Sequence, residues 1–230
     1  MKAMILAAGY GTRMGKLTQE TPKPLLKVGG EPLIFYHLLA LAKAGVQEVV
    51  INTGWLGEQL EDAIQEGKQF GVKVHYSREQ TPLETAGGIR KALPFFGNSP
   101  FIVVNGDVWT DFDFSHLFLP ENRLAHLVLV DNPAHHPEGD FALCHGEVKQ
   151  EAVVGTLTFA GIGCYHPQLF WEYGAHENKL GAVLRQAMSD GKVSGEHHKG
   201  HWWDIGTPER LQALDEQLWA ARTLEENTLG

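Results

Sequence analysis

The chain has 230 residues, of which 43% are hydrophobic and 20% charged, so it can bury the core of an ordinary globular domain. Lys and Arg together number 19 against 28 Asp and Glu, and the resulting net charge of −9 argues against a nucleic-acid binder with a broad basic face. Two cysteines and no apolar run of about 18 residues predict neither a disulfide scaffold nor a membrane-spanning helix. We therefore expect a cytoplasmic protein.

The first half of the chain alternates strand-like and helix-like segments. Apolar runs predict strands at 3–8, 48–53, 72–77 and 101–105, and the segments between them predict helices at about 32–44, 56–66 and 86–93. This alternation is typical of an α/β fold with a parallel sheet. Ligands bind beyond the carboxyl ends of such strands, so the loops at Gly9, Arg78 and Gly106 should share one rim.

The second half continues the same pattern less regularly. We expect strands at 125–130, 157–165 and 200–205, and a helix at about 180–190. Thr207 and Pro208 predict the start of a C-terminal helix, with Thr207 as its N-cap. No linker or repeat separates the halves, so the sequence predicts a single domain over 1–230.

A glycine-rich segment, GYGTRM at 9–14, follows the first predicted strand. Glycines allow backbone N–H groups to wrap a phosphate, and Arg13 adds a fixed cation. The dinucleotide-binding fingerprint does not fit, because Met14 replaces its third glycine and 52–53 holds no acid. The P-loop does not fit either, because Leu17 follows Gly-Lys where Ser or Thr is required. A plain strand-to-helix turn is the alternative to phosphate binding.

Lys23 lies between two prolines in the segment TPKPL at 21–25. Prolines restrict the backbone on both sides, which reduces the ordering cost of holding a phosphate. The alternative is a surface lysine in a proline turn.

These two segments open a longer series of motifs. After 6–14 (LAAGYGTRM) and 22–24 (PKP) come 82–88 (PLETAGG), 105–107 (NGD) and 203–208 (WDIGTP). Their order over roughly residues 1–215 resembles the sugar-1-phosphate nucleotidylyltransferases. The resemblance implies a single-domain Rossmann-like α/β fold of the nucleotide-diphospho-sugar transferase type, with a mixed, mostly parallel sheet and helices on both faces. It also implies a nucleotide-binding half at about 1–110 and a sugar-binding half at about 111–230.

The same resemblance implies the residues of the site. The nucleotide would be bound by Ala8, Gly9, Gly11, Thr12, Arg13, Lys23, Glu79, Glu84 and Thr85, with Arg13 and Lys23 acting in catalysis. The sugar would be bound by Gly88, Asn105, Asp140 and Gly161. Asp107 and Asp204 would hold Mg²⁺, because two carboxylates suit a hard cation that also takes phosphate oxygens.

Four features lie outside this pattern. Glu84 stands where the family more often has glycine, and the Glu-Lys pair by which many relatives hold the sugar phosphate is missing between Phe141 and Gly161. The histidine clusters, His135-His136 and His197-His198-x-x-His201, are interpreted as surface and rim residues rather than a zinc site, because the spacing of the second cluster on a strand and loop does not bring its members to one face. The tryptophans, Trp202 and Trp203 among them, are expected in the core rather than as stacking platforms, with Trp109, just after Asp107, as the one candidate for the sugar pocket.

The implied reaction joins a nucleoside triphosphate to a sugar 1-phosphate, so small molecules are the expected partners of a monomer or small homo-oligomer. The short single-domain members that use UTP and N-acetylmuramate 1-phosphate in bacterial cell-wall recycling resemble this sequence most. Mannose 1-phosphate with GTP, and glucose 1-phosphate with UTP or dTTP, are the alternatives within the family. Outside it, the D-x-D string at 111–113 is compatible with a metal-dependent glycosyltransferase.

Overall fold

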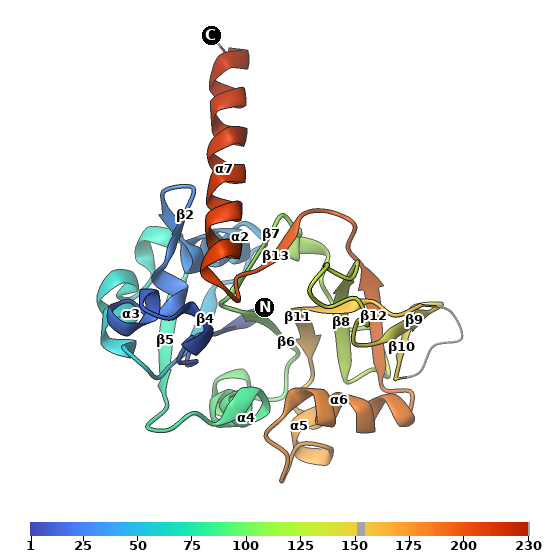
Figure 1. Ribbon diagram of the computed structural model, residues 1–230. Coiled ribbons are helices and arrows are strands. Elements are labelled where there is room, and N and C mark those ends of the chain that lie inside the picture. Colours follow the sequence, from blue (N-terminus) through green and yellow to red (C-terminus); the bar gives the residue numbers. More distant parts are fainter. Residues whose placement is uncertain (151–154, 230) are drawn as a thin grey trace.

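The computed structural model describes residues 1–150 and 155–229 and centres on a nine-stranded sheet (Figure 1). Strands β1 (Lys2–Leu6), β4 (Glu48–Thr53), β5 (Lys73–Arg78) and β6 (Phe101–Asn105) form its parallel part. Leu6 is in register with both Asn52 and Asn105, so these strands end at one level. The predicted common rim for the loops that follow them is therefore confirmed.

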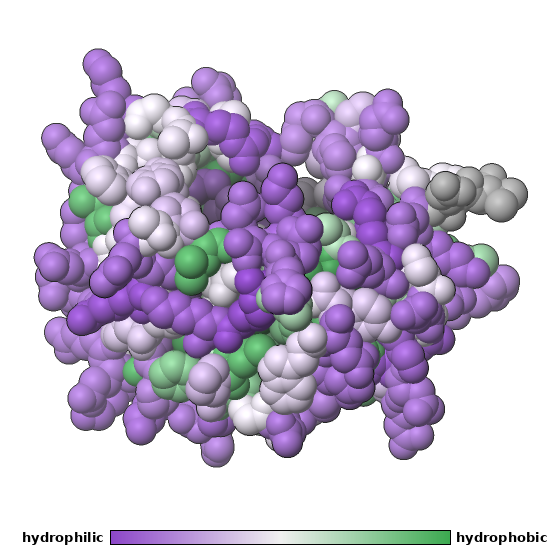
Figure 2. Space-filling model, turned by 90° about the horizontal axis from the view of Figure 1, so that it is seen from below, coloured by the Kyte–Doolittle hydropathy of each residue, from purple (hydrophilic) through white to green (hydrophobic). Residues whose placement is uncertain are grey.

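Helices cover both faces of this parallel part. Successive side chains on β1 point to opposite faces, so each face carries apolar side chains that a helix layer buries. Ala3 and Ile5 pack with α2 (Leu33–Lys43) and α3 (Gly57–Ile64). Met4 belongs to the core on the other face, with α4 (Glu84–Phe96), α5 (Gln168–Glu172) and α6 (Leu180–Ser189). The face that carries α4, α5 and α6 is mostly hydrophilic on its outside (Figure 2).

The remaining strands extend the sheet beyond β6. The order is β5-β4-β1-β6-β11-β8-β12-β10-β9, with β11 antiparallel to β6 and β12 parallel to β8. The bounds are β8 (Ala125–Val130), β9 (Ala142–Cys144), β10 (Glu147–Lys149), β11 (Thr158–Tyr165) and β12 (Val193–His197). The expected mixed sheet with helices on both faces is thus confirmed.

Two small ribbons attach the C-terminal helix to this sheet. One pairs β7 (Val108–Thr110) with β13 (Trp202–Asp204), and the other pairs β2 (Lys27–Val28) with β3 (Glu31–Pro32). Helix α7 (Pro208–Leu229) begins beside them, and its far end projects from the molecule (Figure 1). Met14, Leu33, Ile205 and Leu214 form a small buried cluster at this junction.

Five short helical segments complete the fold: α1 (Leu17–Glu20), η1 (Thr12–Met14), η2 (Lys23–Leu25), η3 (Lys68–Phe70) and η4 (Phe114–His116). Within the described residues, no helix has the length and apolar character needed to cross a bilayer.

Most predicted elements are present, with shifted ends. The first strand stops at Leu6 rather than at residue 8, because the Ala7 N–H donates to the Asn52 side chain instead of to a neighbouring strand (2.7 Å). Helix α4 is longer than predicted and continues past Pro94. Strands β9, β10 and β12 were not predicted, and each is five residues or shorter.

Candidate active site

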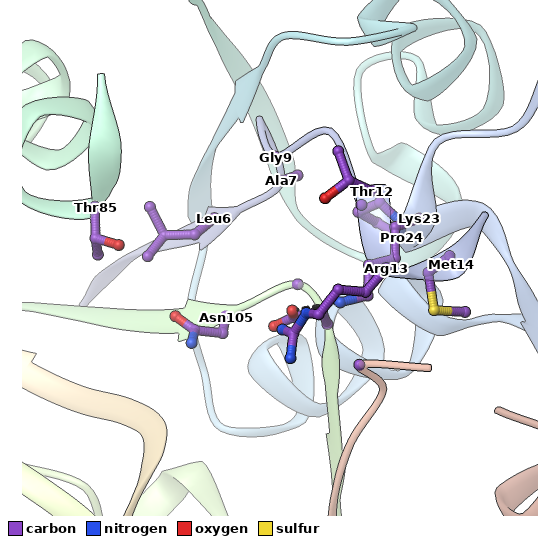
Figure 3. Close-up of a pocket in the computed structure, with 14 residues that line it drawn as sticks. Leu6, Ala7, Gly9, Thr12, Arg13, Met14, Lys23, Pro24, Thr85 and Asn105 are labelled. Atoms are coloured by element: carbon purple, nitrogen blue, oxygen red, sulfur yellow. Dashed lines mark hydrogen bonds and ion pairs between the residues drawn. The ribbon is translucent and has the colours of Figure 1, made fainter. Parts of the chain in front are cut away.

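A cavity of about 320 Å³ opens beyond the carboxyl ends of β1 and β6. The glycine-rich loop, Lys23, Thr85, Asp107 and Gly206 all line it. In Figure 3, Thr85 and Asn105 lie on one side, while Thr12, Arg13 and Lys23 lie on the other. Segments from the start, middle and end of the chain therefore meet at the predicted rim.

The glycine-rich loop forms one wall of this cavity. Gly11 has a φ of 63°, and a Cβ there would lie 2.9 Å from the Thr18 methyl group, so only glycine fits. The Thr18 hydroxyl donates to the Gly11 carbonyl at 2.9 Å and fixes the turn. Gly9 and Thr12 line the cavity beside it, and Arg13 extends into it (Figure 3). This arrangement favours phosphate binding over the plain-turn alternative.

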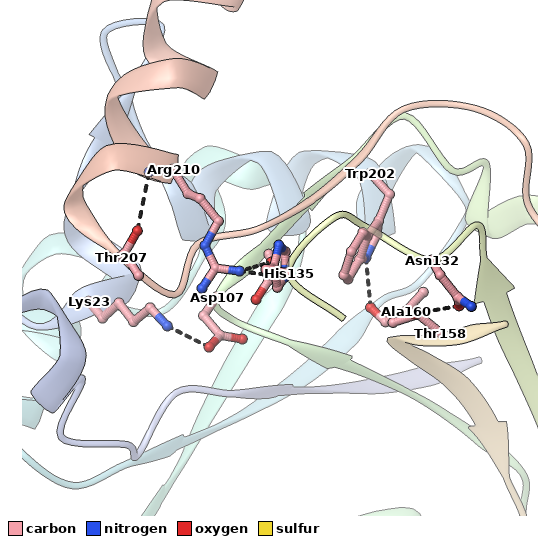
Figure 4. Close-up of polar contacts among 10 residues, drawn as sticks. Lys23, Asp107, Asn132, His135, Thr158, Ala160, Trp202, Thr207 and Arg210 are labelled. Atoms are coloured by element: carbon pink, nitrogen blue, oxygen red, sulfur yellow. Dashed lines mark hydrogen bonds and ion pairs between the residues drawn. The ribbon is translucent and has the colours of Figure 1, made fainter. Parts of the chain in front are cut away.

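Lys23 is held on the short helix η2, between Pro22 and Pro24. Only 8% of the residue is exposed, although it is a lysine. Its Nζ donates to Asp107 Oδ2 at 2.6 Å (Figure 4). Lys23 is therefore a fixed cation inside the cavity, not a mobile surface group.

Asp204 reaches the same place from the other end of the chain. Strand β13 pairs with β7 so that Asp204 lies opposite Val108, and the Ile205 N–H donates to the Asp107 carbonyl at 2.8 Å. Asp107 and Asp204 both line a second cavity of about 400 Å³, together with Arg13. The two carboxylates and the cation predicted to share a site are thus brought together.

Two groups beside Asp204 were not predicted. Arg210 donates to Asp204 Oδ1 at 2.6 Å, and His135 Nε2 lies 2.9 Å from the same oxygen (Figure 4). The signal for Arg210 was the Thr207 cap, which places Arg210 in the first turn of α7 facing the strand end. For His135 the sequence indicated only a surface or rim position, because its contact with Asp204 depends on where the tertiary fold places its loop.

His37 lies near strand β7 of the ribbon that β7 and β13 form. It lies on α2 and is buried, with 2% of the residue exposed, close to Val108 and Asp107. Burial lowers the pKa of His37 from 6.5 to about 4, although the nearby Val108 backbone and Asp107 carboxylate act in the opposite direction. The imidazole is therefore neutral at pH 7.

A third cavity, of about 160 Å³, lies between the glycine-rich loop and the 79–85 segment, where Ala8, Glu79 and Thr85 line it; we call it the base-side cavity, because these three residues are predicted to bind the nucleotide. Glu79 is buried, and its carboxylate accepts hydrogen bonds from the Asn52 amide (2.8 Å) and the Leu83 N–H (3.0 Å). Glu79 therefore ties the 79–83 loop to β4 while facing the cavity. Asn52, which the sequence singled out only for not being acidic, lines the same cavity.

The structure shows the backbone setting of two residues of the 82–88 segment, Glu84 and Gly88. Glu84 has a φ of 58°, a left-handed conformation that favours glycine. Gly88, which is predicted to bind the sugar, lies on the face of α4 that packs against Glu79 and Asn52. A Cβ there would lie 2.7 Å from Glu79 Oε1 and 3.0 Å from Asn52 Nδ2. Its small size leaves room for those two side chains.

The sugar side is built from a turn and a bulged strand. Asp140 Oδ2 accepts from the Phe159 N–H at 2.8 Å, and Oδ1 lies 3.2 Å from His136 Nε2. Gly161 has a φ of 72°, and a Cβ there would lie 2.5 Å from Asn105 Nδ2, so only glycine fits. Asn105, Asp140 and Gly161 all line the 400 Å³ cavity, as predicted from the sequence.

Trp202 packs against the main hydrophobic core, as expected, but it also reaches a cavity, whereas Trp109 lines none of the cavities described here. Trp202 lines the sugar-side cavity, and its indole N–H donates to the Ala160 carbonyl at 2.9 Å (Figure 4). Trp109 instead packs in the small cluster at the start of α7, with its ring 6.3 Å from that of Tyr36.

The D-x-D string has structural contacts. Asp111 Oδ1 accepts from the His201 N–H and lies near His198, both at 2.9 Å. Asp113 caps the short helix η4 through Ser115 (3.0 Å). Neither carboxylate lines the cavities around Asp107, which removes the observation that favoured a glycosyltransferase.

Comparisons with known proteins agree with this geometry. The family model described as "Nucleotidyl transferase" matches residues 2–153, which is more than half of the chain. The chain belongs to the nucleotidyl transferase family. It is 52% identical over 221 residues to an N-acetylmuramate α-1-phosphate uridylyltransferase from Neisseria meningitidis serogroup B, covering 92% of this chain and 96% of the relative.

More distant members of the family are also similar. The catalytic subunit beta of mannose-1-phosphate guanylyltransferase from Danio rerio is 31% identical over 90% of this chain, which spans 62% of that protein. A crystal structure of a putative glucose-1-phosphate thymidylyltransferase from Bacillus anthracis superposes with a TM-score of 0.83 at 22% identity, covering 95% of both chains. This likeness confirms the nucleotide-diphospho-sugar transferase type of fold.

Proposed function

We propose that this protein joins UTP and N-acetylmuramate 1-phosphate to give UDP-N-acetylmuramate and pyrophosphate. The observation that carries the reaction type is the meeting of Arg13, Lys23, Asp107 and Asp204 around connected cavities. The choice of substrates rests on the Neisseria relative, because its 52% identity extends over nearly the whole length of both chains. The protein is proposed to act in the cytoplasm, where its two cysteines are free thiols.

The chemistry needs no nucleophile from the protein. A phosphate oxygen of the sugar 1-phosphate attacks the α-phosphorus of UTP, the bond to the bridging oxygen of the β-phosphate breaks, and pyrophosphate leaves with that oxygen. The attacking oxygen is already anionic, so the protein contributes alignment and neutralisation of charge.

Arg13 and Lys23 supply the positive charge. The backbone amides of the glycine-rich loop and the Arg13 guanidinium face the phosphate cavity, where they would hold the triphosphate. Lys23 is fixed between two prolines, so its ammonium is positioned before substrate binds. A fixed cation stabilises the extra negative charge of the transition state without first having to reorganise.

Asp107 and Asp204 fit the ligand set of Mg²⁺. They are hard oxygen donors, with Asp107 in the turn just before β7 and Asp204 at the end of the paired strand β13, and they line a cavity with room for water and phosphate oxygens. Among the described residues no three or more His, Cys, Asp or Glu side chains are grouped as a metal cage, so phosphate and water would complete the shell. When bound, Mg²⁺ supplies positive charge at the α-phosphate. Lys23 and Arg210 hold the two carboxylates in place.

The test is a matrix of each nucleoside triphosphate against N-acetylmuramate, N-acetylglucosamine, glucose and mannose 1-phosphates, with release of pyrophosphate as the readout. We expect the highest kcat/KM for UTP with N-acetylmuramate 1-phosphate. A higher value for GTP with mannose 1-phosphate would overturn the proposal in favour of the function of the Danio rerio relative. Metal dependence is measured in the same assay by removing divalent cations with EDTA and restoring Mg²⁺.

A further inference from the structure

A fourth cavity, of about 300 Å³, lies between the first turns of α4 and α6. It shares Thr85 and Asn105 with the phosphate cavity, and Asp140 with the sugar-side cavity. Lys179 and Arg185, from the start and the middle of α6, line its other side. A sugar bound between Asn105 and Asp140 would therefore have two cations within the adjoining space.

The fold fixes where these two cations stand. The Arg185 guanidinium carbon lies 5.7 Å from the centre of the Phe141 ring, a cation–π arrangement on a residue that is only 3% exposed. Phe141 directly follows Asp140, so Arg185 is anchored beside the sugar-binding turn. Residue 181 is glycine, and a Cβ there would lie 3.3 Å from Arg185 Nη1, so the small residue leaves room for the guanidinium beside the helix.

Lys179 is placed by the loop before α6. The Arg90 guanidinium, from α4, donates to the carbonyls of Gly174 and Glu177. The Lys179 N–H donates to the Glu177 carboxylate at 2.8 Å. These contacts fasten the beginning of α6 to α4, next to Thr85, which lines both this cavity and the phosphate cavity.

The charges around the site leave these two cations without a partner on the phosphate side. Lys23 is paired with Asp107, and Arg210 with Asp204. Within residues 1–150 and 155–229, neither Lys179 nor Arg185 forms a side-chain ion pair. Asp140, in the same cavity, already bonds Phe159 and His136. Glu84 and Asp140 line the same cavity, so the formal charges of its lining cancel. Lys179 and Arg185 nevertheless form no side-chain ion pair within the described residues, and a neutral sugar would leave them unpaired.

We propose that Lys179 and Arg185 bind the carboxylate of the lactyl group, the substituent that distinguishes N-acetylmuramate from N-acetylglucosamine. This inference rests on the proposed function. Glucose, mannose and N-acetylglucosamine 1-phosphates carry no anion other than the phosphate, whereas the lactyl ether adds one. Arg185 offers a planar pair of donors that matches a carboxylate, and Lys179 adds a second charge. The α6 cations would thus select the sugar.

The test compares two sugar phosphates that differ only in the lactyl group. The variants are Arg185→Met and Lys179→Met, with Arg185→Lys to retain the charge. Lys73→Met serves as the matched control, because Lys73 is exposed on β5, at the opposite edge of the sheet from β9 and β10. We measure kcat and KM with UTP for N-acetylmuramate 1-phosphate and N-acetylglucosamine 1-phosphate.

Arg185→Met is expected to lower kcat/KM for N-acetylmuramate 1-phosphate by about 10- to 100-fold, mainly through KM, because a charged hydrogen bond is lost. Turnover of N-acetylglucosamine 1-phosphate should change less than about threefold, which also shows that the variant folds. Lys179→Met should act in the same direction, and Arg185→Lys should restore part of the loss. Calorimetric binding of UDP-N-acetylmuramate and UDP-N-acetylglucosamine gives the same comparison without turnover.

Equal losses for both sugars would overturn the proposal, because they would assign these cations to the phosphate. Unchanged discrimination in Arg185→Met and Lys179→Met would overturn it as well. Both results leave the proposed function intact, provided that the unmodified protein uses N-acetylmuramate 1-phosphate. Failure of the unmodified protein to use that sugar would instead refute the proposed function.

Discussion

The two sides of the site are built differently. The phosphate side uses continuous motifs that directly follow parallel strands, such as residues 9–14 after β1 and Asp107 after β6. The sugar side uses the 139–141 turn, the bulge between Phe159 and Ile162 and the start of α6, which lie on different elements. Local sequence spacing specifies the first arrangement, whereas only the packed fold specifies the second. Changes on the phosphate side should therefore affect every substrate, and changes on the sugar side only some.

The largest expected effect lies on the phosphate side. Lys23→Ala removes a fixed cation, and we expect kcat/KM to fall by about 10²- to 10³-fold for every sugar phosphate tested. Asp107→Ala should lose at least as much, because it removes both the partner of Lys23 and a proposed Mg²⁺ ligand. The measurement is steady-state release of pyrophosphate with two different sugar phosphates.

Lys27→Ala is the control for Lys23→Ala, since Lys27 is exposed on the neighbouring strand β2. Circular dichroism should show that all three variants fold. Near-normal turnover in Lys23→Ala, or a loss confined to one sugar, would remove the distinction between the two sides.

The next prediction concerns stability and the buried His37, which lies next to Asp107. Because its pKa falls from 6.5 to about 4 on folding, the unfolded chain binds one more proton between these values. Stability from this group is fully present above pH 6.5 and is lost as the pH falls toward 4. When the pH falls from 7 to about 4.5, the free energy of unfolding of the unmodified protein should drop by about 2 kcal/mol more than that of His37→Gln.

Urea unfolding at both pH values measures this difference. Other histidines and carboxylates titrate in the same range, but they are present in both proteins and cancel in the comparison. His75→Gln is the control, because His75 is on the sheet edge and bonds Glu48 at 3.0 Å. A parallel pH dependence for the unmodified protein and His37→Gln would show that His37 is not held neutral.

A smaller and more selective effect is expected at Asp140. Asp140→Asn keeps an oxygen for the Phe159 N–H but removes the negative charge that faces the sugar. We expect KM for the sugar phosphate to rise about tenfold while KM for UTP is unchanged, because one charged hydrogen bond is weakened. Initial rates with each substrate varied in turn provide the measurement.

Asp131→Asn is the matched control, since Asp131 is 81% exposed and pairs with His197 away from the cavity. An equal rise in both KM values would place Asp140 on the phosphate side or in the fold alone.

The fold was predictable where the chain alternates elements. The parallel strands and the helices between them follow from apolar runs that end at glycine or proline, and all were found close to their predicted places. Strands β9, β10 and β12 were missed because each is short, and β10 and β12 also contain polar residues, as in GEVKQ around β10. Their pairing depends on long-range contacts that no local pattern encodes.

The site was predictable in the same places. Arg13, Lys23 and Asp107 lie within motifs whose backbone conformation is local, so the sequence placed them correctly in one cavity. For Gly88 the sequence did not indicate the close packing against Glu79 and Asn52, because what surrounds a helix glycine depends on the tertiary fold. Arg185 was not identified at all, since a single arginine in a predicted helix carries no sign of the cavity it faces.

Glu84 lies where the two sides meet, and it gives the smallest expected effect. It lines both the base-side cavity and the cavity between the first turns of α4 and α6, and its backbone has a φ of 58°. This conformation costs a residue with a Cβ about 1 kcal/mol of stability, whereas glycine adopts it without that cost. Against this, glycine loses more entropy on folding and removes a favourable charge from the first turn of α4. We expect Glu84→Gly to raise the free energy of unfolding by about 0.5 kcal/mol, measured by urea unfolding.

Activity in the same variant shows what the strained residue is for. Glu84→Gly should lower kcat/KM by about two- to tenfold, because the side chain that faces both cavities is lost. Glu84→Gln, which keeps the strain and the length but removes the charge, separates the two effects: it should lower activity without raising stability. A Glu84→Gly protein that is more stable and fully active would show that the left-handed glutamate serves neither side of the site, and that glycine would do as well there.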